Sequence, residues 1–216
     1  MKIIVFGAHI MDAELMAGGL AVKYSPFGHD IRFIALTGTK EDPLYEDMKR
    51  AEKILGVTSD CLGIRKDELL KDSVINEITI MLLKEKPDFL VTHWSGSWHP
   101  THRKTHFLIL ESIQRILKIS SFSLSLENVL FGENFEDLKD FSPDIYIPLE
   151  EEEVNKWFLA LEEFRIFREE KSLDFKGNLS YFPYKGFYRS MVRVHGLEID
   201  LEYATVFKKL HSLKLM

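Results

Sequence analysis

The sequence contains a single cysteine, Cys61, among its 216 residues. One thiol excludes a disulfide framework and also a zinc site made of four cysteines. No apolar stretch approaches the ~20 residues that a membrane-spanning helix requires, so we expect no membrane span. The first apolar run ends at Gly7, well short of the apolar region of a signal peptide, and we therefore expect a cytoplasmic protein.

The sequence also has no excess of positive charge. It has 28 Lys and Arg residues against 34 Asp and Glu residues, which gives a formal net charge of −6. A protein that binds nucleic acid through its phosphates needs a basic surface, so we expect no nucleic-acid partner. Hydrophobic residues make up 45% of the chain, which is enough to build a sizeable core and excludes general disorder.

Short apolar runs alternate with longer segments of helical periodicity, a pattern typical of parallel β/α units. The run from Lys2 to Gly7 is apolar on both faces, as a buried parallel strand should be. Strands at 31–36 and 89–93 continue this pattern, and the first helix is expected at 13–24. The sequence therefore predicts a Rossmann-like three-layer α/β/α fold with a mostly parallel sheet.

The remaining elements are expected to complete one domain, residues 1–216. The tail from about residue 172 is rich in aromatic residues and is predicted to be irregular, with a last helix at 202–210. We expect this tail to pack over the core, and its alternative roles are to line a pocket or to join copies in a homo-oligomer. The other predicted elements are helices at 44–55, 73–86 and 101–118, strands at 61–64, 129–131 and 145–147, and a helix whose first turn is 150–153.

Side chains capable of chemistry gather where two of the predicted strands end. His9, Asp12 and Glu14 follow the first strand. His99 and His102 stand at the start of the helix that follows the strand ending at residue 93. In a Rossmann-like sheet these two strands are neighbours at the topological switch point, where open α/β sheets place their sites. We therefore expect His9, Asp12, His99 and His102 to surround one crevice, although the two segments are far apart in sequence.

Two imidazoles and one carboxylate are ligands suited to Zn²⁺ or to another divalent transition metal. Three protein ligands leave a fourth coordination position open, which is the catalytic rather than the structural arrangement. A metal ion in such a site activates water for attack on an amide bond and polarises the amide carbonyl. His102 and His106, one helical turn apart, form an alternative ligand pair.

Two segments resemble the motifs of a known family. The segment from Gly7 to Gly19 is similar to the opening of the LmbE-like (PIG-L) zinc-dependent N-deacetylases, whose motif is Ala-His-Pro-Asp-Asp-x-Glu followed by a Gly-Gly helix. The segment His99-Pro-Thr-His102 resembles that family's second motif, His-Pro-Asp-His. Weaker similarity extends as far as Phe207. The resemblance implies a Rossmann-like fold and removal of acetyl groups from N-acetylglucosamine-type conjugates, with a small amino-sugar conjugate as the binding partner.

The resemblance also implies a role for each matching residue. His9, Asp12 and His102 match the metal ligands of the family. His99 matches a histidine that stabilises the oxyanion or protonates the leaving amine. Glu14 matches the acidic residue that ends the first motif, and it is either a catalytic residue or a carboxylate that favours the N-terminus of a helix.

The sequence departs from the family at residues that move protons. Met11 stands where the family has the Asp that acts as general base, and Thr101 replaces the Asp of the second motif. A thioether cannot accept a proton, and loss of one general base typically costs about 10²–10⁴ in rate.

Three interpretations follow from this pattern. The first is a metal-dependent hydrolase, an N-deacetylase in which Glu14 or His99 replaces the base. The second is a relative that retains the metal without catalysis and acts as a ligand-binding or regulatory protein. The third, a nucleotide-binding Rossmann domain, is disfavoured because the sequence after the first strand lacks Gly-x-Gly-x-x-Gly. We favour the hydrolase because the fold and the ligand set are complete.

Overall fold

The computed structural model describes residues 1–119, 124–173 and 179–211 of the chain. Its strands are β1 (Lys2–Gly7), β2 (Asp30–Ala35), β3 (Thr58–Cys61), β4 (Phe89–His93), β5 (Val129–Gly132), β6 (Ile145–Leu149), β7 (Lys171–Leu173), β8 (Leu179–Tyr181) and β9 (Tyr203–Lys209). Within the described residues, one sheet contains seven strands in the order β3-β2-β1-β4-β5-β9-β6, and β7 pairs with β8 in a separate small sheet.

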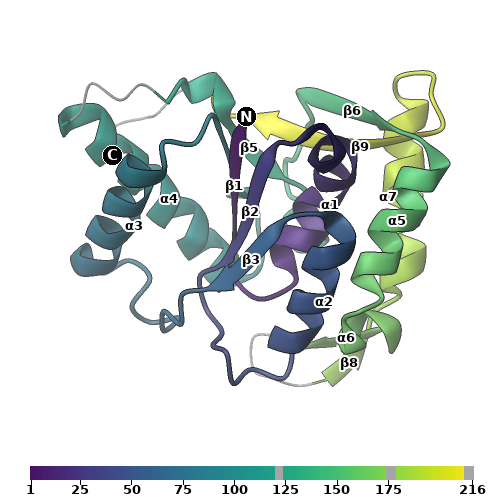
Figure 1. Cartoon of the computed structure of the whole chain (residues 1–216), viewed down its shortest axis with the longest axis horizontal. Coiled ribbons are helices and arrows are strands. Elements are labelled where there is room, and N and C mark those ends of the chain that lie inside the picture. Colours follow the sequence, from purple (N-terminus) through teal and green to yellow (C-terminus); the bar gives the residue numbers. More distant parts are fainter. Residues whose placement is uncertain (120–123, 174–178, 212–216) are drawn as a thin grey trace.

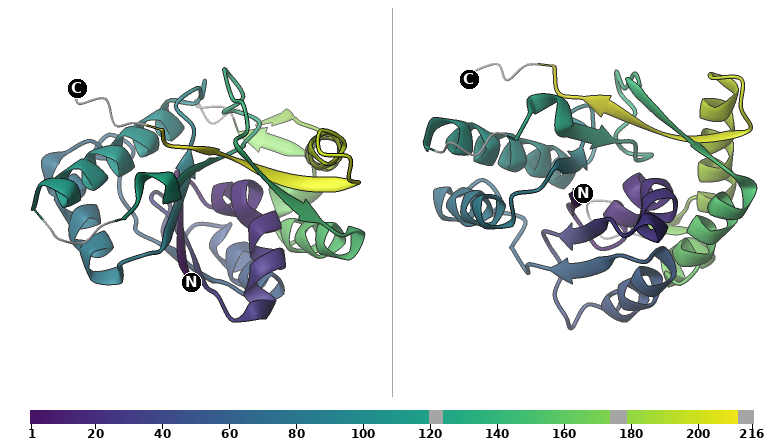
Figure 2. Two further views of the ribbon diagram at one scale, coloured as in Figure 1. Left: turned by 90° about the horizontal axis from the view of Figure 1, so that it is seen from above. Right: turned by 45° about the horizontal axis from the view of Figure 1, so that its top comes forward.

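Helices cover both faces of the large sheet. They are α1 (Asp12–Tyr24), α2 (Tyr45–Leu55), α3 (Asp72–Glu85), α4 (Pro100–Ile119), α5 (Glu151–Leu161), α6 (Arg165–Arg168) and α7 (Tyr184–Leu197), with short 3-10 turns at Ser25–Phe27 and Leu126–Asn128. Helices α3 and α4 lie on one side of the sheet, and α1, α2 and α5 lie on the other (Figure 1; Figure 2). The predicted three-layer α/β/α arrangement is confirmed. Among the described helices, none combines the length and the apolar composition that crossing a membrane requires.

The centre of the sheet is parallel. Strand β1 pairs in parallel with β2 on one side and with β4 on the other, so that Ile3 lies opposite both Ile31 and Phe89. Strand β4 pairs in parallel with β5, and only the insertion of β9 between β5 and β6 brings antiparallel pairing. Strands β1 and β4 are therefore neighbours, as the Rossmann-like order predicts. The loops after β1, β4 and β5 leave the same edge of the sheet.

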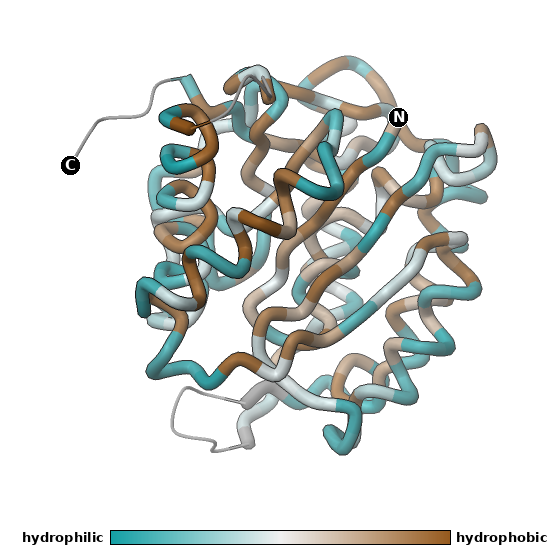
Figure 3. The backbone as a smooth tube through the Cα atoms, turned by 60° about the vertical axis from the view of Figure 1, so that its left-hand side comes forward, coloured by the Kyte–Doolittle hydropathy of each residue, from teal (hydrophilic) through white to brown (hydrophobic). Residues whose placement is uncertain are grey.

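The strands are apolar on both faces because helices bury both faces. Ile3 and Val5 of β1 belong to the hydrophobic core under α1, α2 and α5, whereas Ile4 and Phe6 belong to the core under α3 and α4. In Figure 3 hydrophobic residues follow the central strands, while the outer helices alternate between hydrophobic and hydrophilic residues. Burial of each such side chain stabilises the folded state by about 1.5–3 kcal/mol. Packing on both faces therefore fixes the edge of the sheet from which the loops after β1, β4 and β5 leave.

The C-terminal part of the chain is more regular than the sequence predicts. Tyr184–Leu197 forms helix α7 where we predicted irregular structure, and Tyr203–Lys209 forms strand β9 where we predicted a helix. Every residue from Tyr203 to Phe207 is buried, so the strand shows no alternation, and an apolar run of this length cannot be told from a buried helix by periodicity. The parts of the predicted tail at 174–178 and 212–216 lie outside the described residues.

The bounds of several strands differ from the prediction: β2 begins and ends one residue earlier, β5 ends one residue later, and β3 and β6 differ as follows. Strand β3 occupies Thr58–Cys61 rather than 61–64, since its polar sequence gives no apolar run to recognise. Strand β6 continues through Pro148 to Leu149 instead of ending at the proline. Strand β6 is the edge of the sheet, where the N–H that proline lacks is not needed for pairing.

Gly18 of α1 lies against the indole ring of Trp157 in α5. A Cβ atom at this position would lie 2.1 Å from Trp157 Nε1, which donates a 2.8 Å hydrogen bond to the Glu14 carbonyl oxygen. We predict that Gly18→Ala lowers the free energy of unfolding by about 1–3 kcal/mol because the larger residue displaces the ring. Chemical denaturation measures this loss.

Gly186→Ala is the matched control for this substitution. Gly186 lies in α7, and a Cβ atom there would meet nothing within 4 Å. Since alanine favours a helix by up to about 1 kcal/mol over glycine, this variant should be as stable as the wild type or more stable. Equal effects of the two substitutions would contradict the packing that we describe between α1 and α5.

Candidate metal centre

The turn between β1 and α1 brings His9 and Asp12 together. Asp12 Oδ2 accepts a 2.7 Å hydrogen bond from the His9 backbone N–H and lies 3.2 Å from His9 Nδ1. Met11, at the N-cap of α1, has a φ of 85°, in the left-handed region that methionine rarely adopts. This backbone conformation turns the chain sharply enough for the side chains on either side of it to meet.

The N-terminus of α4 supplies two further histidines. His99 precedes the helix, which begins at Pro100 as predicted, and His102 lies in its first turn. His102 Nδ1 is 2.9 Å from Asp137 Oδ1, so this nitrogen carries the hydrogen and donates it to the carboxylate. The other nitrogen, Nε2, consequently faces the turn after β1 and lies 3.4 Å from Asp12 Oδ2.

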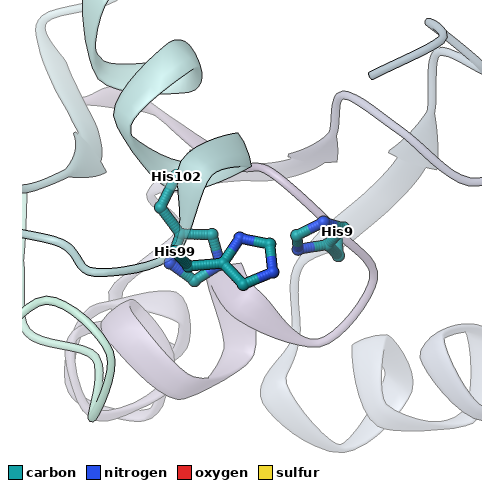
Figure 4. A group of neighbouring side chains, drawn as sticks. All are labelled: His9, His99 and His102. Carbon is teal, nitrogen blue, oxygen red and sulfur yellow. The ribbon is translucent and has the colours of Figure 1, made fainter. Parts of the chain in front are cut away.

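Three imidazole rings converge at this edge of the sheet (Figure 4). His9, His99 and His102 each offer one ligand nitrogen, and these nitrogens lie within 4.8 Å of one another. His9 Nε2 and His99 Nδ1 are buried and have no hydrogen-bond partner, and His102 Nε2 has only the contacts with the Asp12 and Glu136 carboxylates at 3.4 Å and 3.2 Å. Buried polar atoms in folded proteins are nearly always paired, so two unpaired nitrogens beside these carboxylates indicate a site for a ligand.

Asp12 lies beside both predicted histidine ligands. Its Oδ2 is 3.2 Å from His9 Nδ1 and 3.4 Å from His102 Nε2, close to the separation of about 3.3 Å between ligand atoms in a tetrahedral zinc site with bonds of 2.0–2.1 Å. Among the described residues, however, the groups whose ligand atoms all lie within 4.8 Å of one another are His9 with His99 and His102, and Asp12 with His93 and His102. The role of His9, Asp12 and His102 as one set of metal ligands stays a prediction.

The charges around His102 also attract a cation. Burial lowers the pKa of His102, but the carboxylates of Asp12 and Asp137 outweigh burial and raise that pKa well above its ordinary value. A cation at Nε2, either a proton or a metal ion, is therefore favoured. The nearby His99 differs: burial, together with His102 and His9, lowers its pKa to about 3, and its ring is neutral at pH 7.

His93, the last residue of β4, forms a second group of candidate ligands with Asp12 and His102. Its two nitrogens are already engaged, because Nε2 accepts a 2.9 Å hydrogen bond from the Ala8 backbone N–H and Nδ1 lies 2.6 Å from Asp137 Oδ2. His93 therefore connects β1 to β4 and offers no free lone pair to a metal. The sequence analysis identified His93 only as a strand end.

Two carboxylates after β5, Glu136 and Asp137, were missed by the sequence analysis. Asp137 is fully buried and its two oxygens accept hydrogen bonds from His93 and His102. Glu136 is buried beside it, with Oε2 3.2 Å from His102 Nε2, and burial raises the pKa of Glu136 to about 7. The sequence does contain a signal for them. Strand β5 was predicted, and if it pairs in parallel with β4, the residues that follow both strands lie at the same edge of the sheet.

A cavity of about 440 Å³ opens beside these groups. His9, Met11, Asp12, His99 and Glu136 line it on the side of the candidate ligands. The rest of its wall is formed by the loops after β2 and β3, by Phe135 in the connection after β5 and by Tyr184 of α7. The residues from the loops after β2 and β3 include Thr37, Thr39, Asp42, Arg65 and Lys66. The volume is suited to a small molecule.

Two candidate residues from the sequence, Glu14 and His106, do not line this cavity. Glu14 is buried on α1 but does not line the cavity, and burial raises its pKa to about 8. A catalytic role for Glu14 stays a prediction that this placement does not favour. His106 joins neither group of candidate ligands in the described residues; its Nδ1 donates a 2.9 Å hydrogen bond to the His93 carbonyl oxygen. The alternative ligand pair of His102 and His106 stays a prediction, which the engagement of His106 Nδ1 does not favour.

Asp137 orients His102, which makes it a positioning residue for the candidate metal. Asp137→Asn keeps the shape but loses the charge that holds Nδ1–H, and we predict about a 10–100-fold loss of zinc affinity. Titration against a chromogenic chelator measures this affinity. Asp140→Asn, an exposed position in the same connection after β5, is the control and should bind zinc like the wild type. Unchanged affinity in Asp137→Asn would contradict the orienting role.

Comparison with solved structures places this fold among known proteins, whereas the sequence matches no family model. The conserved protein TT1542 from Thermus thermophilus is similar with a TM-score of 0.77 and 19% identity, over 100% of this chain and 96% of that one. The 4-carboxy-2-hydroxymuconate hydratase GalB from Pseudomonas putida is similar with a TM-score of 0.75 and 14% identity, over 100% of this chain and 98% of that one.

A third similar structure is N,N'-diacetylchitobiose deacetylase from Pyrococcus horikoshii. Its TM-score is 0.69 and its identity 20%, over 96% of this chain and 83% of that one. Identities this low establish the fold and leave the activity open, and the hydratase shows that the fold serves more than one reaction. The structural neighbours include LmbE-like (PIG-L-type) deacetylases, the family that the motifs resemble, and this chain has their Rossmann-like fold.

Proposed function

We propose that this chain is a metal-dependent N-deacetylase that hydrolyses the acetamide of an N-acetylglucosamine-type or other N-acyl amino-sugar conjugate. The observation that carries the proposal is the convergence of His9, His99 and His102 around Asp12 beside a cavity, with His9 Nε2 and His99 Nδ1 buried and without a hydrogen-bond partner among the described residues. The fold, shared with deacetylases, and the two motifs support the same reaction.

In this proposal His9, Asp12 and His102 hold Zn²⁺ or another divalent transition metal. The bound ion supplies Lewis acidity, which polarises the acyl carbonyl and activates water. Asp137 and the backbone of the β1–α1 turn fix the orientation of the ligands. His99, neutral and without a partner at Nδ1, faces the same space and is suited to bind the oxygen that gains negative charge in the transition state. Removing one such group typically costs about 10²–10³ in rate.

The cavity favours a small substrate with an apolar face. Phe135 and Tyr184 line one side of it, and Phe135 stacks on Phe182 with ring centroids 4.1 Å apart. A fixed aromatic surface of this kind packs well against the C–H face of a sugar ring. The similar structure from Pyrococcus horikoshii is a deacetylase of N,N'-diacetylchitobiose, which supports an N-acetyl amino sugar as the substrate class.

A second candidate is a protein that retains the metal and binds a ligand without turnover. Met11 favours it, because a thioether lines the cavity where a proton acceptor is expected. This candidate and the hydrolase share the metal centre and differ only in whether an amide is cleaved. We favour the hydrolase, since the cavity wall contains other groups that accept protons.

We predict that protein reconstituted with Zn²⁺ and then desalted retains about one equivalent of metal per chain. A His9→Ala, Asp12→Ala double variant should lose it, because two of three ligands are removed. His29→Ala, Asp30→Ala removes a His-Asp pair far from the cavity and should retain the metal. Elemental analysis measures all three proteins, and full retention of metal by the first double variant would contradict the site.

Hydrolytic activity of the metal-loaded protein provides a second test of the proposed function. Metal-loaded protein should release acetate and a free amine from N-acetylglucosamine conjugates, and removal of the metal with a chelator should abolish the release. Bound metal without cleavage of any amide in such a panel would favour the ligand-binding candidate. Hydration of an unsaturated acid by the same preparation would instead point to the reaction of the hydratase with this fold.

A further inference from the structure

The proposed hydrolysis requires a group that takes a proton from the attacking water. Carboxylate and imidazole side chains do this efficiently, and the thioether of Met11 cannot. Among the described residues, the carboxylates that line the cavity are Asp12, Asp42 and Glu136. The imidazoles that line the cavity are His9 and His99. In the proposed function His9 holds the metal and His99 binds the oxygen that gains negative charge, so the carboxylates remain as candidates for the proton acceptor.

Two of these carboxylates, Asp12 and Asp42, are engaged in other interactions. Asp12 Oδ2 accepts the His9 backbone N–H at 2.7 Å and, as a predicted metal ligand, has its lone pairs engaged. Asp42 Oδ1 accepts the Leu44 backbone N–H at 2.9 Å and so holds the turn that leads into α2. The contacts of Asp42 include none of the candidate ligands.

Glu136 is placed differently. Its Oε2 lies 3.2 Å from His102 Nε2, the same nitrogen that lies 3.4 Å from Asp12 Oδ2. Glu136 is only 6% exposed, yet it forms part of the cavity wall. Its carboxylate is thus inside the site, beside the candidate metal position and in contact with the space that a substrate would enter.

The backbone around Glu136 is fixed, whereas its carboxylate is not. The Glu136 carbonyl oxygen accepts a 3.0 Å hydrogen bond from the Trp98 backbone N–H, which ties the loop after β5 to the loop before α4. Apart from the contact with His102, no hydrogen bond to either carboxylate oxygen is present among the described residues. A carboxylate held near the site without a structural partner is suited to exchange protons with bound water.

We infer that Glu136 is the general base of the proposed deacetylation, an inference that rests on the proposed function. The Glu136 carboxylate takes one proton from water while the water oxygen bonds to the acyl carbon. The bond between that carbon and the amide nitrogen then breaks, and the proton passes to the leaving nitrogen. The products are a carboxylic acid and a free amine, and Glu136 returns to its ionised form.

Glu136→Gln tests this role because it preserves the shape of the side chain and removes its ability to accept a proton. Relative to the metal-loaded wild type, kcat should fall about 10²–10⁴-fold while KM changes little. Zinc affinity, measured by chelator competition, should equal that of the wild type. This second readout also shows that the variant is folded.

Glu133→Gln is the matched control. Glu133 lies in the same connection after β5, but its Oε2 is 2.7 Å from His195 Nε2 and it does not line the cavity. The same chemical change there should leave kcat and zinc affinity unchanged. A loss of rate in both variants would indicate a general effect on the loop and would overturn the assignment.

Met11→Asp in the Glu136→Gln background provides a rescue. Aspartate adopts the left-handed conformation of position 11 more readily than methionine, and its carboxylate would enter the same cavity wall. We expect kcat to recover at least about tenfold, since a general base is restored. No recovery would mean that Glu136 contributes something other than proton transfer, which would overturn the assignment.

The remaining outcomes separate this inference from the proposed function. Wild-type activity in Glu136→Gln overturns the role of Glu136 alone. A loss of zinc in Glu136→Gln makes Glu136 a metal ligand and also overturns its role as base. A metal-loaded wild type that cleaves no N-acetyl amino sugar overturns both the inference and the function on which it rests.

Discussion

The site depends on one buried carboxylate, Asp137. Its oxygens hold His93 Nδ1 at 2.6 Å and His102 Nδ1 at 2.9 Å, which fixes the tautomer of both rings. His93 in turn accepts the Ala8 backbone N–H and so positions the turn that carries His9 and Asp12. A buried charge costs several kcal/mol unless it is compensated, and here two N–H groups compensate it. The hydrogen bonds of Asp137 therefore tie together the carboxyl ends of β1, β4 and β5.

The sheet topology makes that contact feasible. Strands β1, β4 and β5 are adjacent and parallel, so their carboxyl ends meet at one edge although the residues are distant in sequence. The helices α1 and α4 follow β1 and β4 after the short loops 8–11 and 94–99, and they provide rigid bases for Asp12 and His102. The two cores above and below the sheet keep this edge in place. The cavity wall beside the candidate metal centre is thus built from short loops on a rigid frame.

The sequence predicts the parallel centre of the sheet and the meeting of His9 with His102, because buried strands and the order of β/α units follow general rules. It does not predict the role of Asp137 or Glu136, since which side chain turns back toward the site depends on the path of the loop after β5. Glu14 illustrates another limit: two residues after Asp12 on a helix, it points to nearly the opposite side. The sequence predicts a helix in place of strand β9 because Tyr203 to Phe207 are all buried and show no alternation.

X-ray absorption spectroscopy of the zinc-loaded protein tests the central claim most directly, because it reports the atoms bound to the metal. We predict two imidazole ligands and oxygen donors at about 2.0–2.1 Å, and loss of one imidazole contribution in His102→Ala with no change in His106→Ala. A sulfur ligand, or a spectrum that His102→Ala leaves unchanged, would contradict the account and place the metal elsewhere.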